Sequence, residues 1–183
     1  MKEGGAIVLL ALSAAALSGC AEKPLAQQVF GSGLAVAADA TGPETAEIRF
    51  SAEAKYESQR GVPLAGDPVI CRRDGMFRVK TVEATAATPR IAVKAGEEIS
   101  VTSVIQWLNA GWQKTCWPFV AFTPESAGRY VVVNERIGGK GASAMWTGVG
   151  RQSCAVSVYK ETADGVQRIE TRKSSSAACQ GQH

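Results

Sequence analysis

Hydrophobic and polar residues alternate most regularly between Ile48 and Tyr56, where every second side chain is apolar. A period of two places one set of side chains on the buried face of a β-strand and leaves the other set in solvent. Short runs rich in β-branched and aromatic residues recur along the chain, with turn residues between them. The further strands predicted in this way are Val69–Cys71, Met76–Val82, Arg90–Lys94, Glu98–Leu108, Phe119–Thr123, Arg129–Arg136, Ala144–Val149, Cys154–Glu161 and Val166–Thr171.

Turn signals separate these predicted strands. Asp74-Gly75 and Asp164-Gly165 are typical of two-residue hairpin turns. The alternation slips near Ser103, which predicts a bulge or a break between two strands, and Asn109–Lys114 reads as a loop. No stretch after the N-terminal segment shows a helical period. Many short strands with turns between them indicate a single all-β domain, a β-sandwich over residues 47–183.

The first residues predict an export signal. Ala6–Leu17 is apolar, but it is shorter than the about 20 residues that a membrane span requires. It ends in L-S-G-C, which resembles a bacterial lipobox and implies cleavage after residues 1–19, with lipid attached to the thiol and amine of Cys20. The alternative is an ordinary secretory signal with a chance cysteine. Ala21 is not the aspartate that retains lipoproteins in the inner membrane, so the resemblance implies an outer-membrane anchor facing the periplasm.

Residues 20–46 are rich in Ala, Gly, Gln and Thr and contain two prolines. This composition predicts a flexible tether that lifts the domain off the membrane. A weak strand is expected within it, near Leu34–Ala38.

The chain has five cysteines, and lipidation of Cys20 leaves four. An even number in an exported chain predicts two disulfides, for which three connectivities exist. We favour Cys116–Cys154 and Cys71–Cys179, because the first two cysteines flank adjacent predicted strands. A zinc site made of all four thiolates is the alternative, but the spacings contain no C-x-x-C pair.

The segment F-V-A-F-T-P-E-S-A-G-R-Y-V-V-V, preceded by Cys116 and followed by C-A-V-S-V, resembles a pattern of small uncharacterised bacterial lipoproteins. Their shared core is F-x-P-x-x-G-x-Y-x-V, and here the spacing from Pro124 to Gly128 is one residue longer. The resemblance covers roughly the last half of the domain. It implies an Ig-like or transthyretin-like sandwich with a strand-linking disulfide, and it brings no activity or catalytic residue.

Charge and residue content narrow the function classes. The net charge is +3 and the basic residues are scattered, which argues against nucleic-acid binding. The only histidine is the terminal His183, so neither a Ser-His-Asp or Cys-His centre nor a histidine metal site is expected, and no cofactor is predicted. The glycine-rich Ile137–Gly141 lacks the spacing of a phosphate-binding loop. An acid/base hydrolase would use two of the carboxylates, which are Glu97, Glu98, Glu125, Glu135, Glu161 and Asp164.

Four tryptophans lie within a short part of the chain. Trp107 is predicted in the core, since aromatic side chains bury large areas. Trp112, Trp117 and Trp146 are candidates for a surface that stacks against a glycan or peptide, although Trp117 is also expected to pack near the Cys116 disulfide.

We therefore expect a membrane-anchored envelope lipoprotein with a non-enzymatic role in binding or assembly, and an envelope protein or glycan as partner. A module that contacts carbohydrate or peptidoglycan through the tryptophans is the first alternative. A carboxylate-based hydrolase is the second.

Overall fold

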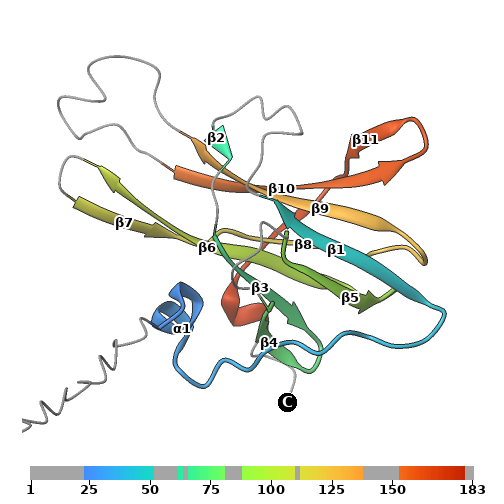
Figure 1. The fold of residues 1–183 in the computed structure, drawn as a ribbon, viewed down its shortest axis with the longest axis horizontal. Coiled ribbons are helices and arrows are strands. Elements are labelled where there is room, and N and C mark those ends of the chain that lie inside the picture. Colours follow the sequence, from blue (N-terminus) through green and yellow to red (C-terminus); the bar gives the residue numbers. More distant parts are fainter. Residues whose placement is uncertain are drawn as a thin grey trace, which may run out of the picture.

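The computed structural model describes residues 23–51, 62–63, 66–80, 88–109, 112–137 and 153–179. Two six-stranded sheets pack face to face (Figure 1), which confirms the predicted all-β sandwich. Sheet one has the order β11 (Gly165–Arg168), β10 (Ser153–Thr162), β9 (Arg129–Ile137), β1 (Thr45–Ser51), β5 (Arg90–Lys94), with β2 (Val62–Pro63) also on β9. Sheet two has the order β12 (Arg172–Ser174), β8 (Phe119–Phe122), β6 (Ile99–Asn109), β3 (Asp67–Arg72), β4 (Gly75–Arg78), with β7 (Trp112–Cys116) also on β6.

The core between the sheets comes from the period-two pattern. In β1, Ala46, Ile48 and Phe50 are buried, while the residues between them are half-exposed. Tyr130 and Val132 of β9 and Val156 and Val158 of β10 point into the same core, and Val132 and Val158 are fully buried. The strand pairs are antiparallel except β1 with β9, which run parallel with Phe50 opposite Val132. Residues 52–56 of the predicted first strand lie outside the described part of the chain.

Both predicted hairpins are confirmed, although each two-residue turn lies one position earlier than predicted, at Arg73-Asp74 and Ala163-Asp164. Gly75 opposes Arg72 between β3 and β4, and Gly165 opposes Thr162 between β10 and β11. Their φ angles of 135° and 130° lie in the region that favours glycine.

The bulge or break predicted near Ser103 is wrong, because β6 is one continuous strand and its pairing with β3 has no extra residue between Ser100 and Val104. The alternation is lost there because residues 101–105 are buried on both faces of the sheet. The loop predicted at Asn109–Lys114 is also wrong: β7 begins at Trp112. β7 and β8 pair with β6 in one register, with Cys116 opposite Ile105 and Phe122 opposite Ile99.

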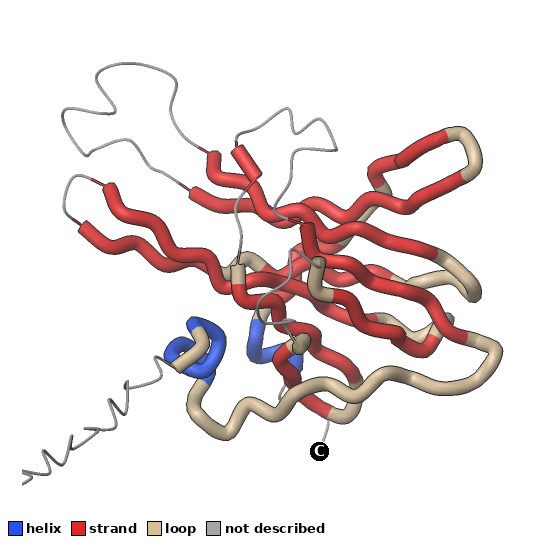
Figure 2. Tube along the Cα trace, viewed as in Figure 1, coloured by secondary structure: helices blue, strands red, loops and turns tan. Residues whose placement is uncertain are grey.

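The tether predicted over residues 20–46 is wrong for its described part, because residues from 23 onward pack against the domain. A short helix, α1 (Leu25–Phe30), lies on the outer face of sheet two (Figure 2). Ala26 is fully buried there against Val69 and Val104. Six residues with few charges carry too little periodicity to signal a helix, and it is the tertiary contact that stabilises so short an element.

Residues 35–44, here called the edge strap, follow α1 and run along one side of the sandwich (Figure 1). The strap exchanges two backbone hydrogen bonds of 2.8 Å with Arg78 at the edge of β4. Further on it meets β5, where the Ala92 N–H donates to Asp39 Oδ1 at 2.7 Å. The strand expected at Leu34–Ala38 is reduced to a bridge between Val36 and Arg78. The strap therefore covers one edge of each sheet, where unpaired backbone groups would otherwise be exposed.

Two disulfides close the fold, with the pairing favoured from the sequence. Cys71 in β3 is bonded to Cys179 in a 3₁₀ turn, η1 (Ser176–Cys179). Cys116 in β7 is bonded to Cys154 in β10. The reason for expecting this second pair was wrong, because β7 and β10 belong to different sheets rather than to adjacent strands. The bond therefore joins the two layers of the sandwich.

The chain crosses from sheet two to sheet one between β8 and β9, within the F-x-P…G-x-Y pattern. Tyr130 is buried, and its hydroxyl accepts a 2.9 Å hydrogen bond from the Glu125 N–H. This is the arrangement of a tyrosine corner in β-sandwiches. Ala127, with φ 56°, and Gly128 form the tight part of the crossing. The residues that carry the family resemblance thus serve the connection between the layers.

Candidate functional site

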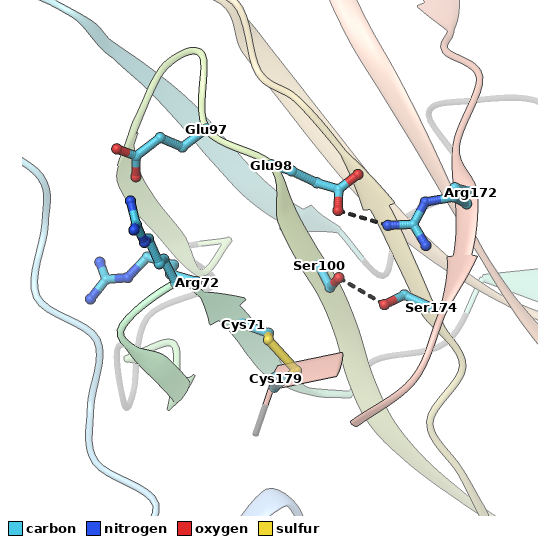
Figure 3. Close-up of a pocket in the computed structure, with 9 residues that line it drawn as sticks. Cys71, Arg72, Glu97, Glu98, Ser100, Arg172, Ser174 and Cys179 are labelled. Atoms are coloured by element: carbon cyan, nitrogen blue, oxygen red, sulfur yellow. Dashed lines mark hydrogen bonds and ion pairs between the residues drawn. A yellow bond between two sulfur atoms is a disulfide. The ribbon is translucent and has the colours of Figure 1, made fainter. Parts of the chain in front are cut away.

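A polar pocket of about 320 Å³ opens on the outer face of sheet two (Figure 3). β3, β6, β12, η1 and the turns after β3 and β5 build it. Its lining consists of five charged side chains, two serines and a disulfide: Arg72, Arg73, Glu97, Glu98, Arg172, Ser100, Ser174 and Cys71–Cys179.

Contacts between the C-terminal segment and the sheet hold this pocket in shape. Arg172 forms a 2.7 Å ion pair with Glu98, and the hydroxyls of Ser100 and Ser174 are 2.9 Å apart (Figure 3). The Cys71–Cys179 disulfide ties the same segment to β3. Three different kinds of bond therefore fix β12 and η1 on the sheet.

Two neighbouring arginines at one side of the pocket differ in how they are held. The Arg72 guanidinium pairs with Asp74 at 3.2 Å, donates to the Ala38 carbonyl at 3.0 Å and lies 4.6 Å above the centre of the Phe77 ring. These contacts fix its orientation. Arg73 is exposed and forms no ion pair with any carboxylate in the described part of the chain. It is the pocket cation with the greatest freedom to bind an anionic or polar group.

A second hollow, of about 360 Å³, lies between α1 and the β6–β7 hairpin. Its lining, here called the α1 surface, is Leu25, Gln28, Val29, Gln106, Thr115 and Trp117. Trp117 is 40% exposed, and its ring meets Phe30 edge to face with 6.1 Å between ring centres. The sequence did not predict the role of α1 in this surface.

Trp117 is the one candidate ligand-contact tryptophan whose side chain the structure describes. Trp112 has a described backbone in β7, but its side chain lies outside the described set, as does that of Trp107. Trp146 lies outside the described residues altogether, as does Cys20. A platform made of three tryptophans therefore stays a prediction.

Of the carboxylates considered for acid/base chemistry, Glu97 and Glu98 are adjacent in the turn before β6 and both line the polar pocket, while the others lie elsewhere in the fold. Three of these carboxylates are exposed and form ion pairs: Glu97 with Lys94, Glu98 with Arg172, and Glu125 with Lys160. Glu135 is only 3% exposed and lies in β9 of the other sheet. Burial, and secondarily the charge of Glu135, raise the pKa of the nearby Tyr159 phenol.

Sequence reasoning missed a row of ion pairs across the outer face of sheet one. It joins four strands through Arg90, Glu47, Arg49, Glu161 and Arg129. Glu161 accepts contacts from both Arg49 and Arg129 and is 17% exposed. The outward polar positions of β1 were the available signal, but cross-strand neighbours follow only from the register. This row orders the strands of sheet one, and its Glu47 and Arg90 also line a hollow of about 450 Å³ beside the edge strap.

Within the described ranges, no three or more His, Cys, Asp and Glu side chains gather as metal ligands would. Nor does any helix of this part of the chain have the length and hydropathy needed to span a membrane.

Comparisons of the chain with known protein families, curated proteins and solved structures find no match.

Proposed function

We propose that this chain is a lipid-anchored envelope protein that acts by binding and not by catalysis. One observation carries the proposal: four of the five cysteines form two disulfides, and the fifth is Cys20 of the lipobox-like sequence. Structural disulfides are typical of exported proteins. The proposal accounts for every cysteine, with four for stability outside the cytoplasm and one for attachment to the outer membrane.

The polar pocket supports a binding role. It is preformed, it presents Arg73 without an ion-pair partner in the described chain, and its two cysteines are joined in a disulfide. Its serine hydroxyls contact each other, and the lining residues that the structure describes include no histidine. Such groups recognise a partner through hydrogen bonds and charge. We propose that a polar or acidic segment of an envelope protein binds here.

For the carbohydrate alternative, the described structure contributes the partly exposed Trp117, and the platform of three tryptophans stays a prediction. The hydrolase alternative would need two carboxyl groups facing each other across a cleft. Of the six carboxylates named for it, Glu97, Glu98 and Glu125 are instead exposed and engaged in ion pairs.

The intact mass of the mature protein from membrane fractions tests the anchor. We expect a triacylated chain beginning at Cys20, with a mass that rises on reduction by the hydrogens of two disulfides. The Cys20→Ser variant should leave the membrane fraction and keep both disulfides. An unlipidated wild-type mass would refute the proposal.

Cross-linking in intact envelopes tests the pocket. The Arg73→Glu variant should lose the cross-linked partner, because it reverses the exposed charge. Arg168→Glu makes the same charge change on β11 of the other sheet, where Arg168 is also exposed, and should keep the partner. Equal cross-linking by both variants would remove the pocket from the proposal.

A further inference from the structure

The described structure begins close to the predicted lipid-bearing residue. Lys23 is three residues after Cys20, and three extended residues span at most about 11 Å. Pro24 then leads directly into α1. Whatever conformation the intervening residues adopt, Lys23 cannot lie farther than this from an acylated Cys20, and the start of α1 at Leu25 cannot lie farther than about 18 Å.

α1 is fixed to the domain and cannot act as a spacer. Ala26 is fully buried, and its N–H donates a 2.8 Å hydrogen bond to Asp67 Oδ2. Phe30 packs edge to face against both Trp117 and Phe119. A lipid on Cys20 therefore holds one particular side of the sandwich, the α1 side, at the bilayer.

The chemistry of the α1 surface suits a lipid headgroup layer. Trp117 is 40% exposed beside the half-buried Leu25 and Val29, with Gln28, Gln106 and Thr115 around them. Tryptophan is enriched at membrane interfaces, where its apolar ring and its N–H are both accommodated. Residues 23–33 and 112–118 contain two lysines, Lys23 and Lys114, and no carboxylate. Their positive charge favours anionic headgroups.

We infer that the α1 surface rests on the bilayer that carries the Cys20 lipids, with the Trp117 indole among the headgroups. The inference depends on the proposed lipid anchor. Of the possible occupants of this surface, the bilayer is favoured because a link of at most about 11 Å keeps Lys23, and α1 directly after it, close to the membrane.

This orientation also places the polar pocket. The α1 surface and the polar pocket both lie on the outer side of sheet two. Gln106 at the α1 surface is six residues along β6 from Ser100 in the pocket. At the rise of a β-strand, this separation is about 20 Å. The pocket and the α1 surface are therefore separate sites, and lipid at the α1 surface does not occupy the pocket.

Fluorescence quenching by brominated lipids tests the inference. The lipidated full-length chain is reconstituted into phosphatidylcholine–phosphatidylglycerol vesicles, and tryptophan emission is compared with and without bromine on the acyl chains. We expect quenching in the wild type and loss of most of it in Trp117→Phe, which keeps an aromatic ring against Phe30. Trp107→Phe is the matched control, since it removes another indole and should retain the quenching due to Trp117.

The outcomes separate this inference from the proposed function. An unlipidated intact mass would refute the anchor itself. A lipidated chain with equal quenching in the wild type and Trp117→Phe would overturn the α1 orientation and leave the anchor standing. Emission of Trp117 that shifts with soluble peptidoglycan fragments, but not with lipid, would assign the surface to a glycan instead. Hydrogen exchange gives a second readout, because the amides of α1 should exchange more slowly in vesicles than in the Cys20→Ser variant.

Discussion

Gly128 stands where the chain turns from one sheet to the other, and it has no space for a side chain. A β-carbon there would lie 2.6 Å from the Tyr130 ring and 2.9 Å from the Glu125 carbonyl oxygen. Both neighbours are held by the hydrogen bond of the tyrosine corner, so neither can move without losing it. The small residue and the tyrosine are thus required together.

We expect Gly128→Ala to lower the free energy of unfolding by about 2 kcal/mol, as overpacking of a tight site does. Gly33→Ala is the control, because no atom lies within 4 Å of a β-carbon built at that position. Urea unfolding of the two variants measures the difference. Equal stabilities would show that the corner relaxes easily.

The burial of Asp67 predicts that the stability of the fold depends on pH through this one side chain. Burial raises its pKa above the ordinary 3.8, against the opposing influences of the Ala26 N–H and of Arg78. The folded state therefore keeps this proton at pH values where the unfolded chain has lost it. Stability from this group accordingly falls as the pH rises from about 3.8 through the folded pKa.

Asp67→Asn keeps an oxygen for the Ala26 N–H and removes the charge. We expect this variant to be as stable as the wild type at pH 7, or more stable, and to lose the fall in stability described above. Asp67→Ala removes the acceptor at the start of α1 and should cost about 1 kcal/mol. Thermal unfolding between pH 3 and 7 distinguishes them, and an asparagine variant less stable than the alanine variant would contradict the assignment.

At the scale of elements, the contacts of the edge strap predict that stability is sensitive to the residue at position 37, which is Ala37. Its N–H donates to the Arg78 carbonyl, and proline has no N–H. We expect Ala37→Pro to destabilise the fold by about 3 kcal/mol. Ala37→Gly keeps the N–H and should cost about 1 kcal/mol or less. If urea unfolding gives the two variants the same stability, the strap does not hold the edge of β4.

The strands that the sequence predicted well are those with one solvent-exposed face and one buried face. β1 and β5 follow a period of two, and the turns at Gly75 and Gly165 are signalled by the residues before them. In each case the information is local. The pattern of a strand and its turn lies within about ten residues.

The predictions failed where a distant segment decides the structure. Residues 101–105 lose their alternation because α1 and the segment after it cover the second face of β6. Trp112 reads as part of a loop, yet it pairs with Asn109 in an extended hairpin. The pocket was missed because Arg73, Ser100 and Arg172 are far apart in the sequence, and only the strand order brings them together.

At the scale of the molecule, the two disulfides stabilise different parts of the structure. Cys116–Cys154 joins the sheets, and Cys71–Cys179 holds the C-terminal segment on sheet two. Loop entropy bounds their contributions at about 4 and 5 kcal/mol for separations of 38 and 108 residues.

Replacing either pair with alanines should lower the urea midpoint, with a loss of about 2–4 kcal/mol each. Hydrogen exchange separates the two variants. Cys71→Ala/Cys179→Ala should speed exchange mainly in residues 172–179, whereas Cys116→Ala/Cys154→Ala should leave that segment protected. Uniformly faster exchange in both variants would contradict the division of tasks.

The edge strap has a mechanical consequence under the proposed anchor at Cys20. Tension applied at Cys20 reaches α1 first and then the strap, whose hydrogen bonds to β4 and β5 break one after another. β1 follows, and its bonds to β9 would be loaded together along its length. Released residues 23–44 would extend about 75 Å. In single-molecule pulling from Cys20, we expect this lengthening as a first, low-force step before the sandwich unfolds. Under the proposed anchor, the domain would therefore extend when pulled and keep its fold.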